Sequence, residues 1–480
     1  MAAVEASGNN NKKKKKKKDP IFSLSMEVAR KHHQWQHEVL VLAFPFGSHP
    51  GCLLGLIRKL ADEAPAVKFS FFNTARSNVV IFKDGGRNDN VFPYSVGDGL
   101  PESYANGGGV PAEAAELFLK AARGNFRSAI EAAAEEEVEV GGVVSDAFLG
   151  FAGEMAAEMK VPWVPVWVPG LRSLVLHLHT DLIRQKLADF GMSGDDEEKV
   201  INFLPGFSEI RKIDLPEGIL HGDLESPFAV MLHKMGSHLP KASAIVVNSF
   251  KEAEPEMFDI LKPKLQKLLT TAPINLTSPT SIISDEHGCL EWLDKQKPKS
   301  VAYICFGTFI ALPPHELAAL AEALVESGVR FLWSFRGNPK KSFSEDFLQT
   351  VDVQGKLVPW APQTRVLAHP SVGVFIAHCG WNSVLETIMA GVPMICRPSI
   401  GDNGLNTRTM EFEWNCGLGL EKGIFTKEGA MKAMESILDP QKGAKIRTNL
   451  KALRDLAFQA VGPEGSSTKN FNVLVELLTK

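Results

Sequence analysis

Short apolar runs alternate along the chain with longer stretches in which apolar residues return every three or four positions. The short runs predict buried strands at 37–46, 67–73, 79–82, 142–145 and 245–249 in the first half, and at 301–306, 331–334, 372–377 and 392–396 in the second. The longer stretches predict helices at 52–62, 112–134, 317–325, 426–438, 445–461 and 471–478. Strands that alternate with helices favour parallel sheets covered by helices on both faces.

This alternation is interrupted in two regions, which define the expected domains. Residues 1–36 hold the lysine run Lys12–Lys18 and no foldable apolar pattern, so we expect a disordered leader, with Met26 as an alternative start. Residues 271–286 are polar and contain two prolines, as is typical of a linker. We therefore expect one α/β domain at 37–270, a second at 287–462, and a separate helical end at 463–480.

Composition excludes several classes of function. The 480 residues carry a formal net charge of −4, and the lysine run is the only basic block, so the charge balance does not favour nucleic acid. The six cysteines lack paired metal-ligand spacing and indicate reduced thiols. The apolar run 161–168 is broken by Pro162 and Pro165, and no longer run could span a bilayer. We expect a soluble, cytoplasmic monomer without stable membrane insertion.

A strand, a tight turn and a helix follow one another in the second half. Strand 372–377 ends at His378, and Asn382 and Ser383 lie where the helix begins. The first N–H groups of a helix have no partner within it, so this arrangement predicts an anion site, with diphosphate as the natural ligand. Taken singly, His378 is more often a core or turn histidine and Glu386 a solvated helix residue, so the prediction depends on the whole arrangement.

Two polar residues also follow strands in the first half. His49 comes after strand 37–46 and Asp146 after strand 142–145, and the carboxyl ends of parallel strands share one edge of a sheet. This edge is where α/β folds place their chemistry, so both residues are candidates for a site. The alternatives are an incidental turn histidine and an aspartate that caps the next helix.

The stretch 360–403, WAPQTRVLAHPSVGVFIAHCGWNSVLETIMAGVPMICRPSIGDN, closely resembles the signature of the plant secondary-product glycosyltransferases that use UDP-sugars (family 1). The phrases LAFPFGSH, FSFFNTARSN, HKMGSHLPKA and AVGPEGSSTKNF are similar to the branch that acts on the 3-hydroxyl of flavonols and anthocyanidins. The resemblance implies an α/β protein with the GT-B fold, in which two Rossmann-like domains face each other across a cleft. It also implies that the helix within 463–480 returns to the N-terminal domain.

The resemblance further implies roles for individual residues. His49 would be the general base of an inverting transfer and Asp146 would orient it. Residues expected to bind UDP are Thr308, Trp360, Ala361, Gln363, His378, Asn382, Ser383 and Glu386. Residues expected around the sugar are Val168, Trp381, Asp402 and Asn403, and those around a flavonoid acceptor are Ser48, Phe148, His177, Phe228 and Ser399. No metal and no cofactor are expected, since UDP-sugar is the donor substrate.

Two positions near the sugar depart from the pattern of the branch. Asn403 stands where glutamine is usual for glucose and histidine appears in many galactose users, and Val168 stands where threonine is common. A valine would leave a 6-hydroxyl unpaired, so these residues favour UDP-rhamnose, and a flavonol 3-O-rhamnosyltransferase is the first expectation. A flavonoid 3-O-glucosyl- or galactosyltransferase is the alternative.

Two other classes of protein share parts of this pattern. A non-catalytic UDP-binding protein of the same fold would bind nucleotide without transfer, but the presence of both His49 and Asp146 argues against it. A nicotinamide-dependent epimerase would need G-x-G-x-x-G after the first strand, and the chain has GSHPGC there.

Overall fold

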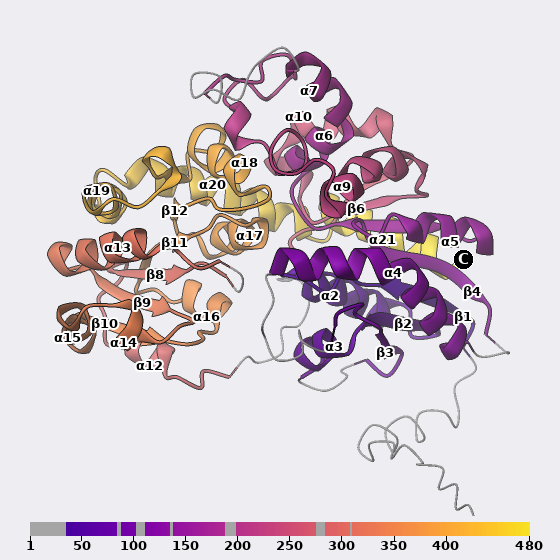
Figure 1. Ribbon diagram of the computed structural model, residues 1–480, viewed down its shortest axis with the longest axis horizontal. Helices are drawn as coiled ribbons and strands as arrows, with labels where there is room; N and C mark the ends of the chain where they lie inside the picture. The colour runs from indigo at the N-terminus through magenta and orange to yellow at the C-terminus, as the bar shows by residue number, and fades with distance from the viewer. Residues whose placement is uncertain are drawn as a thin grey trace, which may run out of the picture.

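The computed structural model describes residues 35–83, 88–101, 111–134, 138–187, 198–274, 284–307 and 310–480. Two parallel sheets, each flanked by helices, form two lobes that lie side by side (Figure 1). The expected leader falls almost wholly outside the described residues, as does most of the expected linker.

The first sheet has seven strands in the order β3-β2-β1-β4-β5-β6-β7, all parallel. They are β1 (His37–Leu42), β2 (Val67–Thr74), β3 (Val91–Val96), β4 (Val140–Asp146), β5 (Trp163–Trp167), β6 (Ile245–Val247) and β7 (Leu268–Thr270). Its helices are α2 (His49–Glu63), α3 (Ala75–Ile81), α4 (Pro111–Ala133), α5 (Phe151–Met159), α6 (Leu171–Leu178), α7 (Thr180–Leu187), α9 (Pro227–His238) and α10 (Pro255–Leu261). One apolar cluster packs α2 on the sheet, and another packs α4, α5, α6 and α9 on it.

The second sheet has six parallel strands in the order β10-β9-β8-β11-β12-β13. They are β8 (Val301–Cys305), β9 (Arg330–Ser334), β10 (Gly355–Val358), β11 (Val372–Ala377), β12 (Met394–Cys396) and β13 (Gly417–Gly419). Its helices are α12 (Cys289–Asp294), α13 (Pro314–Ser327), α14 (Pro339–Ser342), α15 (Glu345–Gln354), α16 (Gln363–Leu367), α17 (Trp381–Ala390), α18 (Asn403–Arg408) and α19 (Lys427–Leu438). Apolar clusters with α13 and α19 on one side and α16 and α17 on the other bury it.

Both sheets reverse their strand order beside the first strand of each, and an open α/β sheet binds ligands at such a reversal. In the first sheet the reversal lies between β1 and β4, and in the second between β8 and β11. Helix α2 therefore begins at the reversal of one sheet, and α17 follows the strand at the reversal of the other. This topology sets the two expected halves of the site at equivalent places in the two lobes.

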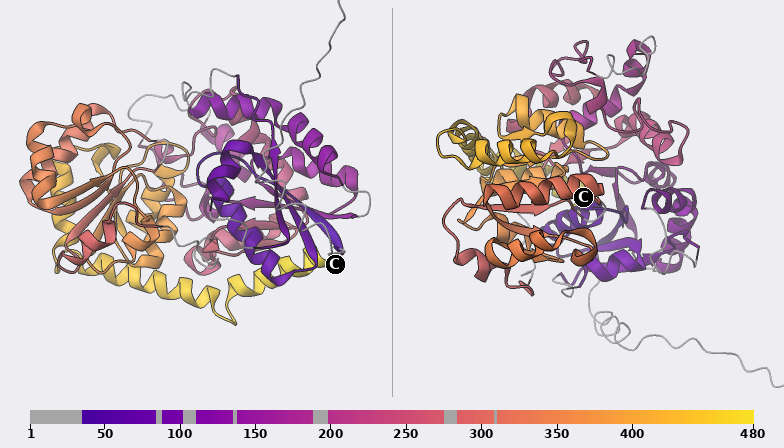
Figure 2. Two further views of the ribbon diagram at one scale, coloured as in Figure 1. Left: turned by 90° about the horizontal axis from the view of Figure 1, so that it is seen from below. Right: turned by 60° about the vertical axis from the view of Figure 1, so that its left-hand side comes forward.

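Two C-terminal helices, α20 (Ala444–Val461) and α21 (Ser466–Thr479), run along one side of both lobes (Figure 2). Helix α20 packs in the second lobe, where Leu450 and Ala457 join the cluster that holds α17. Helix α21 packs Phe471, Leu474 and Leu478 into the first lobe, on the face that α2 covers. Helix α21 thus packs on the sheet that contains β1, the first described strand.

One expected element is wrong, and several strands were not expected. Residues 79–82 were expected as a strand, but they lie at the end of helix α3, where Val79 is 70% exposed. Thr74 caps this helix by accepting a hydrogen bond from Ser77 N–H, and its first residues therefore turn away from the strand before it. Strands β3, β7, β10 and β13 were not expected because they are short or interrupted by Pro and Gly.

Candidate active site

The imidazole of His49 and the carboxylate of Asp146 form a hydrogen bond, with 2.7 Å between Nδ1 and Oδ2. His49 is the first residue of α2, after β1, and Asp146 is the last residue of the neighbouring strand β4. Asp146 is buried, and its other oxygen accepts from Phe148 N–H, so the carboxylate is fixed by the backbone. A carboxylate can only accept, so Nδ1 of His49 is the donor, and in the neutral imidazole Nε2 carries the lone pair. The fold thus brings together two candidate residues that are 97 positions apart.

Aromatic side chains surround this histidine. The ring of Phe148 lies 4.7 Å from the His49 ring, and Phe228 on α9 packs edge-on against Phe148 at 5.8 Å. His177 on α6 contacts Trp167, and burial lowers the pKa of His177 to about 4, so it is neutral at physiological pH. Three of the residues expected around the acceptor therefore gather near the base, and rings of this kind suit a flat apolar ligand.

The second lobe presents the N-terminus of α17 at the carboxyl end of β11. Gly380 precedes the helix in an extended conformation and gives no side-chain cap, so the first N–H groups stay open to a ligand. His378 lies beside it, and a Cβ on Gly380 would come within 2.5 Å of the imidazole Nε2. Only glycine lets the chain pass so close to His378. An oriented imidazole and a helix N-terminus together form an anion site.

Five buried polar atoms at this edge of the second sheet have no hydrogen-bond partner among the described residues. They are His378 Nδ1, Asn382 Nδ2, Ser399 Oγ, Asp402 Oδ2 and Asn403 Nδ2. Burying a polar group without a partner costs about 1–3 kcal/mol, so five such atoms together indicate a surface that a polar ligand completes. Burial also lowers the pKa of His378 to about 4. Its imidazole is neutral and can donate one N–H to an oxygen.

Residues expected to hold a nucleoside lie at the far end of this surface. Trp360 is 48% exposed, and its free area suits a flat ring, while Ala361 beside it is buried. The amide of Gln363 donates to Glu386 at 2.5 Å and accepts from the hydroxyl of Tyr303 at 3.2 Å. Burial raises the pKa of Glu386 to about 7, opposed by the hydrogen bond from Gln363. A ligand diol that donates to Glu386 would stabilise its charged form.

Asp402 connects the two lobes electrostatically. Burial raises the pKa of Asp402 to about 6, and the smaller opposing effects are a hydrogen bond from Asn406, one from its own backbone, and the charge of His49. His49 of the first lobe is thus close enough to Asp402 of the second for its charge to act on that carboxylate. We expect a sugar bound at Asp402 to lie near this histidine.

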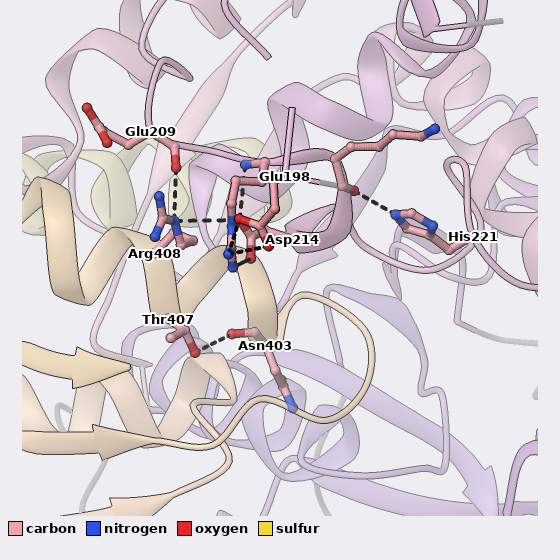
Figure 3. A network of polar contacts seen from close by, with 9 residues as sticks. Glu198, Glu209, Asp214, His221, Asn403, Thr407 and Arg408 are labelled. Atoms are coloured by element: carbon pink, nitrogen blue, oxygen red, sulfur yellow. Dashed lines mark hydrogen bonds and ion pairs between the residues drawn. The ribbon is translucent and has the colours of Figure 1, made fainter. Parts of the chain in front are cut away.

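A polar network holds helix α18 at its last residue, Arg408 (Figure 3). Arg408 donates to the carbonyl of Glu209 at 2.9 Å and lies 3.5 Å from Asp214, which also pairs with Arg211. At the other end of the helix, Asn403 turns its side-chain amide nitrogen away from this network (Figure 3). The network thus holds the backbone of α18 while leaving the Asn403 amide free for a ligand.

Four further residues were expected in the site. Trp381 donates its indole N–H to the carbonyl of Asn248 at 2.6 Å and packs on Gly170, so its side chain joins the lobes and only its backbone is left for a sugar. Val168 is buried in the apolar cluster beneath the first sheet. Thr308 lies outside the described residues. Ser48 is exposed beside His49.

Several residues at the site were not expected from the sequence. Asn248, just beyond β6, donates to Asn382 at 2.9 Å. Arg336 holds its guanidinium 5.2 Å from the centre of the Trp360 ring. Arg336 also lines a cavity of about 410 Å³ that reaches Gly307. Asn248 and Arg336 both follow a strand at its carboxyl end, and this position was the available signal.

Comparison with known proteins identifies the family to which the chain is similar. A family model described as UDP-glucoronosyl and UDP-glucosyl transferase matches residues 280–453. A flavonol 3-O-glucosyltransferase from Actinidia chinensis var. chinensis is 50% identical over 449 residues, covering 93% of this chain and 98% of that protein. The chain belongs to the UDP-glycosyltransferase family. This UDP-glycosyltransferase is also 50% identical to an anthocyanidin 3-O-galactosyltransferase from the same plant, over 92% of this chain and 97% of that one.

Solved structures agree with this UDP-glycosyltransferase assignment. The crystal structure of a UDP-glucose: anthocyanidin 3-O-glucosyltransferase in complex with UDP matches with a TM-score of 0.86 and 39% identity, covering 92% of this chain and 99% of that one. The GT-B fold expected from the sequence is thereby confirmed. The expected preference for rhamnose finds no support, because these relatives are named for glucosyl or galactosyl transfer. Among the described residues, no helix combines the length and hydropathy needed to cross a bilayer.

Proposed function

We propose that this UDP-glycosyltransferase transfers a hexose, glucose or galactose, from its UDP-sugar to the 3-hydroxyl of a flavonol or anthocyanidin. The observation that carries the proposal is the hydrogen-bonded His49–Asp146 pair, set among aromatic rings. The relatives named above, 50% identical, act on flavonols and anthocyanidins according to their names, which supports this class of acceptor.

In the proposed reaction, Nε2 of His49 removes the proton from the acceptor hydroxyl as its oxygen attacks the anomeric carbon. The new C–O bond forms on the face opposite the departing UDP, so the anomeric configuration inverts in a single displacement. The proton resides on the imidazole, and the Asp146 carboxylate stabilises the imidazolium. The negative charge that develops on the diphosphate is met by the N-terminus of α17, the N–H of His378 and the amide of Asn382.

A hexose fits these residues better than rhamnose. A preference for rhamnose would require Val168 to present methyl groups to carbon 6 of the sugar, whereas Val168 is packed into the apolar cluster of the first lobe. Asp402 and Asn403 instead offer a buried carboxylate oxygen and a buried amide N–H, both without partners. An acceptor and a donor side by side suit adjacent sugar hydroxyls, each of which both donates and accepts. Equal identity to a glucosyl- and a galactosyltransferase leaves the choice between these hexoses to this local contact.

The proposal is tested by kinetics of His49→Ala and Asp146→Asn with a flavonol and a panel of UDP-sugars. We expect His49→Ala to lower kcat by about 10²–10⁴-fold, the usual range for general base catalysis, with UDP affinity unchanged. Asp146→Asn keeps the shape but removes the carboxylate charge that stabilises the imidazolium, so a large loss of kcat is expected there too. Full activity of His49→Ala, or clear preference for UDP-rhamnose in the wild-type protein, would refute the proposal.

A non-catalytic UDP-binding protein of the same fold is the competing function. It predicts UDP binding by the wild-type protein with no product from any flavonoid, which mass spectrometry of the same reactions would reveal.

A further inference from the structure

Asn248 lies at the junction of the two lobes, immediately after β6, and is buried. Its side-chain Nδ2 donates to Oδ1 of Asn382, the second residue of α17, at 2.9 Å. Its backbone carbonyl accepts from the indole N–H of Trp381, the first residue of that helix, at 2.6 Å. One residue of the first lobe therefore holds two consecutive residues at the N-terminus that faces the diphosphate site.

The direction of the bond between the two amides is fixed by a third group. Oδ1 of Asn248 accepts from the backbone N–H of Ile274 at 3.4 Å, and a backbone N–H can only donate. Asn248 must therefore turn Nδ2 toward Asn382, and Asn382 must accept this hydrogen bond through Oδ1. This leaves Nδ2 of Asn382 on the other side of the amide, where it is buried and has no partner in the described structure.

We propose that Asn248 is a positioning residue for donor binding, which fixes the amide of Asn382 so that its N–H, and not its oxygen, faces the diphosphate. The proposal rests on the proposed function, because it needs UDP at α17. An unrestrained amide could turn by half a rotation and present an oxygen to an anion, which repels it. Fixing the amide before the ligand arrives removes that orientation and the entropic cost of choosing between the two. The donor site of the second lobe is thereby completed by the first.

The donor site also depends on how the two lobes dock, because hydrogen bonds connect Ile274 to Asn248 and Asn248 to Asn382 across the junction. Trp381 fills the space over Gly170, where a Cβ would come within 2.7 Å of the indole, so the same junction is closed by packing. A shift of one lobe against the other would break the Asn248–Asn382 bond first, because side-chain hydrogen bonds weaken steeply with distance and angle.

The test compares affinities for UDP and for uridine by isothermal titration calorimetry. Asn248→Ala should weaken UDP binding roughly tenfold, since one hydrogen bond to a charged group loses its orientation, while uridine affinity stays within about twofold. Asn248→Asp keeps the shape and the oxygen that accepts from Ile274, and a thermal melt of this variant checks that it is folded. Its carboxylate would draw Nδ2 of Asn382 toward itself and turn the Asn382 oxygen to the phosphate, so UDP affinity should fall further than in Asn248→Ala.

A double-mutant cycle separates positioning from a general loss of structure. If Asn248 acts through Asn382, then Asn248→Ala in an Asn382→Ala background should leave UDP affinity unchanged. Asn90→Ala is the matched control, since Asn90 is also a buried asparagine and bonds three backbone carbonyls at the far side of the first sheet. It should lower Tm without changing UDP affinity.

The outcomes distinguish this inference from the proposed function. Wild-type protein that binds UDP, together with Asn248→Ala and Asn248→Asp of unchanged UDP affinity, would overturn the inference alone. Equal losses for UDP and uridine, or a full additional loss in the Asn382→Ala background, would also overturn it. Wild-type protein that fails to bind UDP would overturn the proposed function itself.

Discussion

The ionisation of Asp402 tests whether a residue placed for ligand binding lowers the stability of the folded protein. Its carboxylate is buried at the start of α18, one oxygen has no partner, and burial raises its pKa from 3.8 to about 6. A carboxyl group with a higher pKa in the folded protein binds its proton more tightly there, so ionisation destabilises the fold. The cost grows as pH rises from about 4 to about 6 and is complete above that.

The magnitude follows from the size of the shift. A difference of about two pKa units corresponds to about 3 kcal/mol at 1.36 kcal/mol per unit, which is an upper limit for the cost above pH 6. Asp402→Asn keeps the shape without the charge, so we expect it to stabilise the ligand-free protein by up to about 3 kcal/mol at pH 8. At pH 4, where Asp402 is mostly protonated in the folded protein, the gain should shrink to about 0.5 kcal/mol.

Thermal melts of both proteins across pH 4–8 measure this effect, with a Tm change of about 2–4 °C per kcal/mol for a domain of this size. The same substitution should lower kcat/KM for the UDP-sugar and leave UDP affinity unchanged, since the proposed role of Asp402 is to hold the sugar and not the UDP. Asp352→Asn is the control, because Asp352 is exposed at the end of α15 and precedes the amino end of β10, whereas the site lies at the carboxyl ends of the strands; it should change neither quantity. A destabilised Asp402→Asn protein at pH 8, or a gain that does not shrink as pH falls, would refute the reasoning.

Two further predictions test the packing around the donor site. Gly380→Ala should weaken UDP binding by an order of magnitude or more, because the new Cβ would come within 2.5 Å of the His378 imidazole. Gly124→Ala on α4, where nothing lies within 4 Å of the new Cβ, is the control. Unchanged UDP affinity of Gly380→Ala by calorimetry would contradict the close approach. Arg408→Ala should lower Tm and raise KM for the UDP-sugar several-fold, since it removes the contacts to Asp214 and Glu209 that hold α18. A lower Tm with unaltered KM would show that this network supports the fold but not the sugar site.

The sequence could predict the elements whose signals are local. Strand 372–377 was expected from its apolar run and matches β11, and the helix that follows it was expected from the change of period. The helix expected at 426–438 matches α19, which Thr426 caps by accepting from Gly429 N–H. The strand predicted at 79–82 was wrong because an apolar tetrapeptide has too few positions to distinguish a strand period from a helix period. The cap at Thr74 stabilises a helix there instead.

The sequence by itself determined the chemistry at each strand end: an imidazole after β1, a carboxylate after β4, and a glycine that opens the N-terminus of α17. These depend on neighbouring residues and on the rule that parallel strands end at one edge. Only the tertiary structure decided what Asn248 and Trp381 do. Their hydrogen bonds join residues more than 130 positions apart, and such contacts exist only where two separately packed lobes bring buried donors and acceptors face to face.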